Sequence, residues 1–447
     1  MPAGSRNLYG PLVLVEGYLL FTLILVVVGP VRYQLHHPVL FWVLMALFHA
    51  AFVFGYMFGV KRTPLRNNRQ RVFSESSFYA SFVLAMLSVV ITLRNATGEL
   101  LINPATVFER AVGGVLDPVS AYVDSKELAA SQGAGASRLL NVLSFGFAFF
   151  KFLFIFQAVY WWGHLTRLKK LFFYVLLFFS ISPGLIIGVN STIFITFIFL
   201  YFSYAVKLLF ETGKRVRVAS VAVIFFICLL VPVGWFGYLM GGRGGIIETI
   251  PDVSPLGDIS VAGYVQGLDP ESFFSFYVYS IVWLLSYVLQ GYYGFSLIIG
   301  KPFDWTYGFG SSPFLQRQFE VFTGVDLSAS TFQRKIAGSW GETSNWHSIY
   351  GQLANDFSVI GVIVPMFLIG FLLSRVWSSV VVGGSFFGMA LLPMFALMFF
   401  FFPASNLVFG YIDTFSYFIV VMACWLVEGR VVSYRKRRQQ SVVGIAS

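Results

Sequence analysis

The sequence predicts an all-α, polytopic integral membrane protein with about 10–12 transmembrane helices, organised as a single transmembrane domain over residues 1–447. Charged residues make up only 11% of the chain, whereas a soluble domain usually carries about 25%. Apolar runs of about 17–25 residues, long enough to cross a hydrocarbon core of ~30 Å, recur from end to end. Basic residues gather in the short segments between these runs, as expected for a membrane protein with a fixed orientation.

The apolar runs define the expected spans in order. They lie near 8–28, 39–59, 77–93, 140–160, 170–187, 190–206, 218–240, 350–374, 379–402 and 406–427. The first run exceeds the roughly 7–15 residues of a signal-peptide core, and no small-residue cleavage site precedes Gly29-Pro30. We therefore expect it to be retained as the first helix.

The distribution of positive charge predicts which segments share a side. Clusters of Lys and Arg occur in 61–71, 167–170, 207–217 and 430–438. The positive-inside rule places these segments, and with them both termini, in the cytoplasm. The long segments 94–139, 241–274 and 300–349 then lie outside. The net charge of +10 thus reflects orientation, and we expect no nucleic-acid partner.

The apolar run 273–299 conflicts with this orientation if it crosses the membrane once, because the basic C-terminus would then lie outside. We therefore expect a re-entrant pair, a broken helix or a helix lying flat on the outer face, within an external region 241–349. Gly291-Tyr292-Tyr293-Gly294 is the expected break. Tyr and Trp are frequent in this run, which suits an interfacial position.

Few cations occur in the external region, so single arginines are the candidate ligands for an anion. Arg243 lies in Gly241-Gly242-Arg243-Gly244-Gly245 after a predicted span. Glycines allow close backbone approach, and Arg offers a forked, permanently charged donor set for phosphate. The alternative is an interfacial Arg at a helix end. Arg317 and Arg334 are second candidates, with a solvated ion pair to Glu320 or Asp326 as the alternative.

His347 is the candidate base, since an imidazole with a pKa near 6.5 accepts a proton at neutral pH. It follows the polar segment and begins an apolar helix; a helix-start histidine hydrogen-bonded to the loop is the alternative. Trp346 and Asp356 are candidate substrate contacts, and Asp356 alternatively holds loop groups by hydrogen bonds. Cys228 and Cys424 lie in apolar runs, and no His or Cys stands at ligand spacing from His347, so we expect no metal and no cofactor.

The C-terminal half resembles the oligosaccharide repeat-unit polymerase (O-antigen polymerase) family. The matching residues are, in order, Gly-Gly-Arg-Gly-Gly at 241–245, Gln-Gly-Tyr-Tyr-Gly-Phe at 290–295, Thr-Tyr-Gly-Phe-Gly at 306–310, Trp346-His347 and Asn-Asp-Phe-Ser-Val-Ile-Gly at 355–361. The spacing after the histidine also resembles the related O-antigen ligases, whose usual Gly is replaced here by Ser358.

The resemblance implies a GT-C-type, metal-independent glycosyltransferase in the bacterial inner membrane. It further implies undecaprenyl-diphosphate-linked glycans as substrates, polymerised on the periplasmic face into O-antigen or capsule-like polysaccharide. A chain-length regulator protein is then a further expected partner. By motif position, Arg243 would bind the diphosphate and His347 would activate the acceptor. Two alternatives stay open: an O-antigen ligase, and a transporter or flippase of lipid-linked sugars, although we find no internal repeat of the kind transporters show.

Overall fold

The computed structural model describes residues 8–61, 73–98, 102–132, 138–211, 218–244, 259–266, 268, 272–342 and 345–443. Within these residues, eight helices are long and apolar enough to cross a membrane, and three shorter apolar helices accompany them. Strand in the described part is limited to one two-stranded pairing. The prediction of an all-α polytopic membrane protein is confirmed, with eight described helices that could cross a membrane by length and composition.

The N-terminal half consists of nine α-helices and one short strand among the described residues. They are α1 (Gly10–Val28), β1 (Val31–Tyr33), α2 (Pro38–Val60), α3 (Glu75–Thr97), α4 (Pro104–Leu116), α5 (Pro118–Gln132), α6 (Arg138–Tyr160), α7 (Arg167–Ile186), α8 (Ser191–Glu211) and α9 (Val218–Gly244), with the 3-10 turn η1 (Trp162–His164) before α7. The segment predicted as an external loop over 94–139 thus contains α4 and α5. Gly114 of α4 lies directly against the backbone of Leu185 in α7, which fixes this hairpin to the bundle.

The C-terminal half alternates long apolar helices with short polar ones. Its elements are β2 (Ile259–Val261), α10 (Gly263–Gln266), α11 (Phe273–Ile298), α12 (Pro313–Thr323), η2 (Ser328–Ser330), α13 (Phe332–Lys335), α14 (Ile349–Gly361), α15 (Ile363–Gly383), α16 (Phe386–Phe401), α17 (Leu407–Gly410) and α18 (Ile412–Val443). The predicted polar segment 300–349 is therefore folded, with three short helical elements between α11 and α14.

Three sequence-based predictions of element boundaries are wrong. Gly291 and Gly294 do not break 273–299, because α11 is continuous through both. The predicted span 350–374 is divided, because Ser358 has φ 65° and ψ 165°, which no helix contains. The predicted spans 350–374 and 379–402 also place the intervening turn too early, because α15 continues to Gly383 and ends at Gly384, whose φ is 63°.

Glycines allow α2 and α15 to pack with their backbones in contact. A Cβ added to Gly55 would lie 2.0 Å from the Phe367 carbonyl oxygen, and one added to Gly370 would lie 2.2 Å from the Phe52 carbonyl oxygen. Small residues at helix crossings are the usual means of close packing inside membranes, where van der Waals contact rather than water exclusion holds helices together. This pair forms the support for α14, which continues directly into α15.

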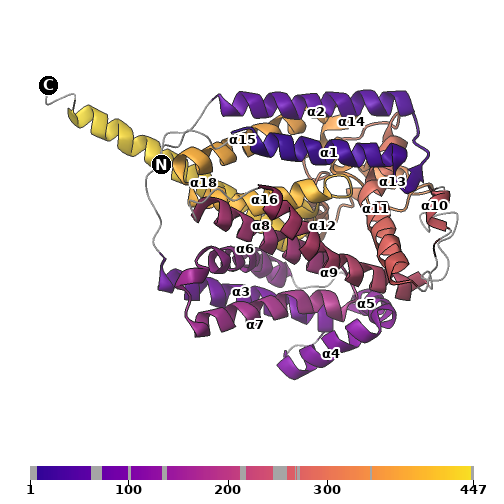
Figure 1. The fold of residues 1–447 in the computed structure, drawn as a ribbon, viewed down its shortest axis with the longest axis horizontal. Helices are drawn as coiled ribbons and strands as arrows, with labels where there is room; N and C mark the ends of the chain where they lie inside the picture. The colour runs from indigo at the N-terminus through magenta and orange to yellow at the C-terminus, as the bar shows by residue number, and fades with distance from the viewer. Residues whose placement is uncertain are drawn as a thin grey trace.

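The segments predicted to be external gather at one end of the bundle. In Figure 1 the right-hand end holds α10 to α14, whereas the start of α1 and the end of α18 lie at the opposite end. β1 pairs antiparallel with β2, with Val31 opposite Val261, so the α1–α2 connection meets the segment after α9 at this end. Figure 1 also shows α11 running across the direction of α1 and α2 rather than along it. By length and composition, Phe274–Ile298 is nevertheless one of the eight described helices that could cross a membrane, so the expectation that 273–299 does not cross once stays a prediction.

Candidate functional site

The polar segment 300–348 is fixed to the membrane helices by one carboxylate, that of Asp356 on α14. Its Oδ1 accepts hydrogen bonds from Thr306 Oγ1 at 2.5 Å, Gly308 N at 2.9 Å and Gly310 N at 3.1 Å, and its Oδ2 accepts from Ser311 N at 2.7 Å. Three backbone amides and a hydroxyl therefore converge on one charge, the arrangement that backbone nests use to hold anions. In this protein the carboxylate of Asp356 is the bound anion. Asp356 therefore holds the loop 306–311 in place, the second of the two roles expected for it.

Asn355, next to Asp356, attaches a second part of the same segment. Its side-chain nitrogen donates to the Gly310 carbonyl at 2.9 Å and to Gln333 Oε1 at 2.8 Å, while its Oδ1 accepts from Phe332 N at 2.9 Å. Asn355 is fully buried. A buried amide must satisfy its donors and acceptors to avoid a desolvation penalty. The two neighbouring polar residues of α14 therefore hold the loop at 306–311 and the start of α13 in fixed positions.

A second amide pair fixes the turn between α16 and α17 against α14. Gln352 Oε1 accepts from Asn406 N at 2.9 Å, and the Asn406 side chain donates to the Ser311 carbonyl at 3.3 Å. Ser312 Oγ donates to the Phe409 carbonyl at 2.6 Å. Gln352 and Asn406 were not among the predicted site residues, and Asn355 was expected only as part of the motif at 355–361. The available signal was their chemistry: amides inside otherwise apolar segments must find partners.

His347 lies behind the polar segment and is buried, with 5% of its surface exposed. Its Nε2 lies 3.4 Å from the Gly341 carbonyl oxygen. A Cβ added to Gly294 of α11 would lie 3.4 Å from the other ring nitrogen, Nδ1, so this side of the ring faces helix backbone. Burial lowers the pKa of His347 to about 4, although the carbonyls of Gly341 and Glu342 favour the charged form. The imidazole is therefore neutral at pH 7 and enclosed by protein.

Trp346 is half-buried and fixed through its backbone. Its amide donates to Gln290 Oε1 at 3.1 Å, and its carbonyl accepts from Trp340 Nε1 at 3.2 Å. Its ring packs edge-on against Tyr287 of α11 and beside Phe401 of α16. Trp346 therefore contacts two helices, α11 and α16, and leaves part of its indole open.

The arginines predicted to bind substrate differ in their surroundings. Arg317 on α12 is exposed, and one guanidinium nitrogen donates to the Gly410 carbonyl at 2.8 Å. Protein atoms crowd round it, and this partial desolvation lowers its pKa while Tyr411 acts in the opposite direction. Arg334 forms an ion pair with Glu342 at 2.9 Å, and this carboxylate raises its pKa. Its direct ion-pair partner is Glu342, and Asp326 adds a weaker favourable charge that also raises its pKa.

Arg243, the third predicted diphosphate ligand, lies in the last turn of α9. Its side chain lies outside the described residues. Gly241 and Gly242 belong to the same helix. The glycine-rich run therefore begins as helix rather than as a loop.

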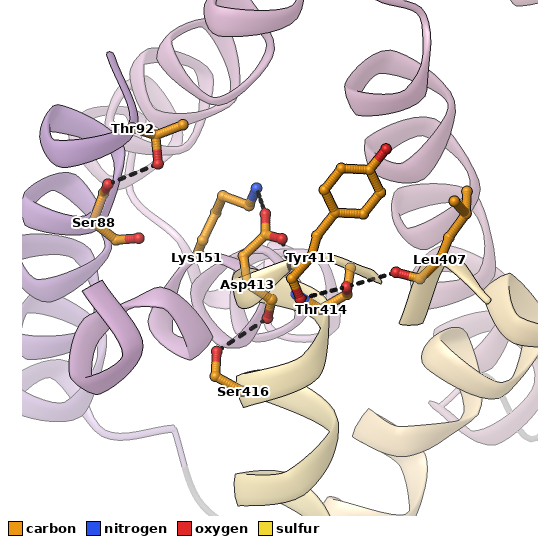
Figure 2. Close-up of polar contacts among 8 residues, drawn as sticks. All are labelled: Ser88, Thr92, Lys151, Leu407, Tyr411, Asp413, Thr414 and Ser416. Atoms are coloured by element: carbon orange, nitrogen blue, oxygen red, sulfur yellow. Dashed lines mark hydrogen bonds and ion pairs between the residues drawn. The ribbon is translucent and has the colours of Figure 1, made fainter. Parts of the chain in front are cut away.

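Two buried ionisable pairs connect helices within the bundle. Lys151 of α6 forms an ion pair with Asp413 of α18, and Figure 2 shows the two side chains pointing toward each other. Asp413 also accepts from its neighbour Thr414 N at 2.9 Å. Glu16 of α1 contacts His49 of α2 at 2.7 Å. Each pair joins two helices: Glu16 and His49 join α1 to α2, and Lys151 and Asp413 join α6 to α18. Asp413 lies at the start of α18, close in sequence to Gly410, which accepts the hydrogen bond from Arg317.

No described residues form a group of three or more His, Cys, Asp or Glu side chains that could hold a metal ion. What the site offers chemically is a rigid polar platform with exposed cationic and aromatic side chains at the end of an apolar bundle. Comparisons with protein families, with characterised proteins and with solved structures find no match for this chain.

Proposed function

We propose that this protein is a membrane glycosyltransferase that polymerises undecaprenyl-diphosphate-linked oligosaccharide repeat units on the periplasmic face of the bacterial inner membrane, with both termini in the cytoplasm. The observation that carries the proposal is the polar segment 300–348, which Asn355 and Asp356 fix to an apolar bundle and which presents Arg317 beside the start of α18. A substrate with a lipid tail, a diphosphate and a glycan needs an apolar, a cationic and a polar surface close together.

Arg317 is the described residue best suited to the diphosphate. A guanidinium has five N–H donors, and one Arg317 nitrogen contacts Gly410, so further donors remain for a ligand. Partial desolvation strengthens its attraction for an anion, because fewer waters screen the charge. Arg334 is a weaker candidate, since Glu342 already neutralises it. Arg243 joins the proposal on its motif position at the end of α9.

The proposed reaction needs stabilisation of the leaving group more than it needs a strong base. An acceptor hydroxyl attacks the anomeric carbon of the donor sugar, a new C–O bond forms, and the bond to the diphosphate breaks with its electron pair. Arg317 stabilises the negative charge that develops on undecaprenyl diphosphate. His347, neutral and enclosed, is a weak base. We therefore propose that it supports the segment, and that the hydroxyl proton leaves late, to the departing diphosphate or to water.

The test is an in vitro polymerisation assay with purified lipid-linked repeats. Arg317→Gln should lower turnover about 10²-fold or more, as expected for loss of one donor that stabilises transition-state charge. Arg317→Lys should also lose activity, because the fork is lost. Lys301→Gln, another exposed cation of the same segment, is the matched control and should be near wild type. Wild-type turnover by Arg317→Gln would remove the catalytic proposal.

An O-antigen ligase is the second candidate, and one observation favours it. Ser358 stands where that family usually has Gly, and its φ of 65° is a backbone conformation that glycine adopts readily. The glycine-like geometry is thus present without the glycine. The same assay separates the two functions, because a ligase transfers the glycan to a lipid A core or a protein and does not lengthen lipid-linked repeats.

A further inference from the structure

A short run of exposed aromatic side chains lies on the polar segment, beside the loop that Asp356 holds. Phe303, Trp305 and Tyr307 expose 42%, 59% and 63% of their surfaces, whereas Thr306 between them is fully buried. The rings of Trp305 and Tyr307 lie 5.0 Å apart between centroids. Thr306 is buried while its neighbours Trp305 and Tyr307 are exposed, so the two rings lie on the outer side of this segment.

The aromatic pair cannot withdraw from solvent, because its backbone is fixed. Thr306 Oγ1 is bound to Asp356, and Gly308 N is bound to the same carboxylate. Tyr307 has φ 56°, a left-handed conformation that costs a residue with a Cβ about 1 kcal/mol or more. Persistent strain beside exposed aromatic rings is typical of binding surfaces.

Polar groups border the rings. Asp304 is paired with Lys335 at 2.9 Å, and the Lys335 ammonium also donates to the Pro302 carbonyl at 2.8 Å. Phe303 stacks on Phe332 of α13, the helix that carries Lys335. Two neighbouring aromatic faces, inclined to each other at 44°, with charged groups at their edge match the chemistry of a sugar ring. One face of a pyranose carries C–H groups that fit the electron-rich face of an aromatic ring, while its hydroxyls reach polar neighbours.

We propose that Trp305 and Tyr307 form a carbohydrate-binding platform that stacks against a sugar ring of the lipid-linked glycan. This inference rests on the proposed function for the identity of the glycan, but not for the chemistry of the platform. The other occupant of exposed Trp and Tyr is the lipid headgroup region, where aromatic residues form belts. An aromatic belt at the headgroups requires neither the strained backbone of Tyr307 nor the four hydrogen bonds that Asp356 makes to this loop. These two features favour a ligand that the rings bind in a fixed position.

The experiment measures binding by the full-length protein in nanodiscs. The probes are the lipid-linked repeat unit extracted from the source bacterium, bare undecaprenyl diphosphate and an array of free oligosaccharides. Trp305→Ala removes one ring; Tyr307→Gly removes the other and suits the left-handed backbone. The control is Phe322→Ala, an aromatic on α12 that is 51% exposed and lies away from the pair in sequence.

We expect each platform variant to weaken binding of the glycan-bearing lipid about tenfold, which corresponds to roughly 1.4 kcal/mol. Both variants should bind bare undecaprenyl diphosphate as the wild type does, and Phe322→Ala should bind both lipids as the wild type does. Equal weakening for both lipids would identify a headgroup belt and overturn the inference, as would no weakening for either. If the wild type ignores lipid-linked repeats but binds a free oligosaccharide through Trp305, the platform stands and the proposed function fails. If it binds no glycan in any form, both fail.

Discussion

Substitution of Ser358 tests whether the break near the end of α14, just before α15, is a built-in feature of the chain. Ser358 has φ 65° and ψ 165°, a region of backbone conformation that is essentially restricted to glycine and costs other residues about 1–3 kcal/mol. Its Oγ also accepts a hydrogen bond from Gly361 N at 3.2 Å, so it caps the helix that follows. Strain and capping act in opposite directions on stability, and two substitutions separate them.

Ser358→Gly stabilises the fold by relieving the strain. It destabilises the fold by a few tenths of a kcal/mol through the lost cap, and by about 0.4–1 kcal/mol because glycine raises the conformational entropy of the unfolded chain. The net expectation is a gain in the free energy of unfolding of about 1 kcal/mol. Ser358→Ala keeps the strain and loses the cap, which costs about 1 kcal/mol. The glycine variant should therefore exceed the alanine variant by about 2 kcal/mol. A regular helix gives the opposite order, because Gly is about 1 kcal/mol worse than Ala there.

The measurement is unfolding in mixed micelles with increasing SDS, followed by the helical circular dichroism signal, for wild type and both variants. Opposite signs for Gly and Ala relative to wild type are the expected result. If Ala is the more stable of the two, residue 358 is helical and the conclusion that α14 is set off from α15 by a strained break is wrong. The glycine variant should keep its activity, since the backbone path is unchanged.

Three further predictions follow from the same contacts. Above pH 6.5, the usual pKa of histidine, His347 is neutral in both the folded and the unfolded protein. As pH falls from 6.5 toward about 4, only the unfolded protein takes up the proton, so the free energy of unfolding should drop by up to about 3 kcal/mol. His347→Gln should flatten this loss in a pH series of unfolding midpoints. Gly55→Ala should prevent close packing of α2 on α15 and reduce folded yield, whereas Gly17→Ala, which meets open space, should not. Asp356→Asn should weaken the attachment of 306–311 by about 3 kcal/mol, because an amide donor would face the Ser311 amide, and faster hydrogen exchange across 306–311 would report it.

The sequence was sufficient for the class of fold because membrane burial depends on local composition. Each long apolar run becomes a helix, since backbone groups in lipid must be satisfied within the segment. The failures occur where tertiary contacts decide. Gly291 does not break α11; it lies where a Cβ would be 2.2 Å from the Pro403 carbonyl oxygen, so the glycine allows α11 to lie against the turn that follows α16. Glycine has the same appearance in sequence whether it bends a helix or allows close packing.

The sequence indicates candidate residue types for the site, but not the contacts that each residue makes. Asp356 was expected to contact substrate or hold loop groups, and its four hydrogen bonds favour the second, with partners about 50 residues earlier in the chain. No local pattern relates an acid on one helix to a glycine-containing loop that far away. His347 was predicted to be a general base or a helix-start histidine hydrogen-bonded to the loop, and nearby Gly294 allows α11 to enclose it. Depth of burial depends on packing between helices, which spacing in one segment does not contain.

The position of Asp356 relative to Ser358 explains why the strain persists. Asp356 lies two residues before the break, and its side chain must face the loop 306–311 for its four bonds to form. A helix continued unbroken from α15 would fix the rotation and direction of this turn by the packing of α2 on α15. The break uncouples the two, so α15 follows its glycine contacts with α2 while α14 directs Asp356 to the loop. The energy of these charged hydrogen bonds, about 1.5–3 kcal/mol each, exceeds the strain at one residue. Ser358→Gly should therefore stabilise the bundle without moving the polar segment, and unchanged hydrogen exchange across 306–311 in that variant is the expected sign.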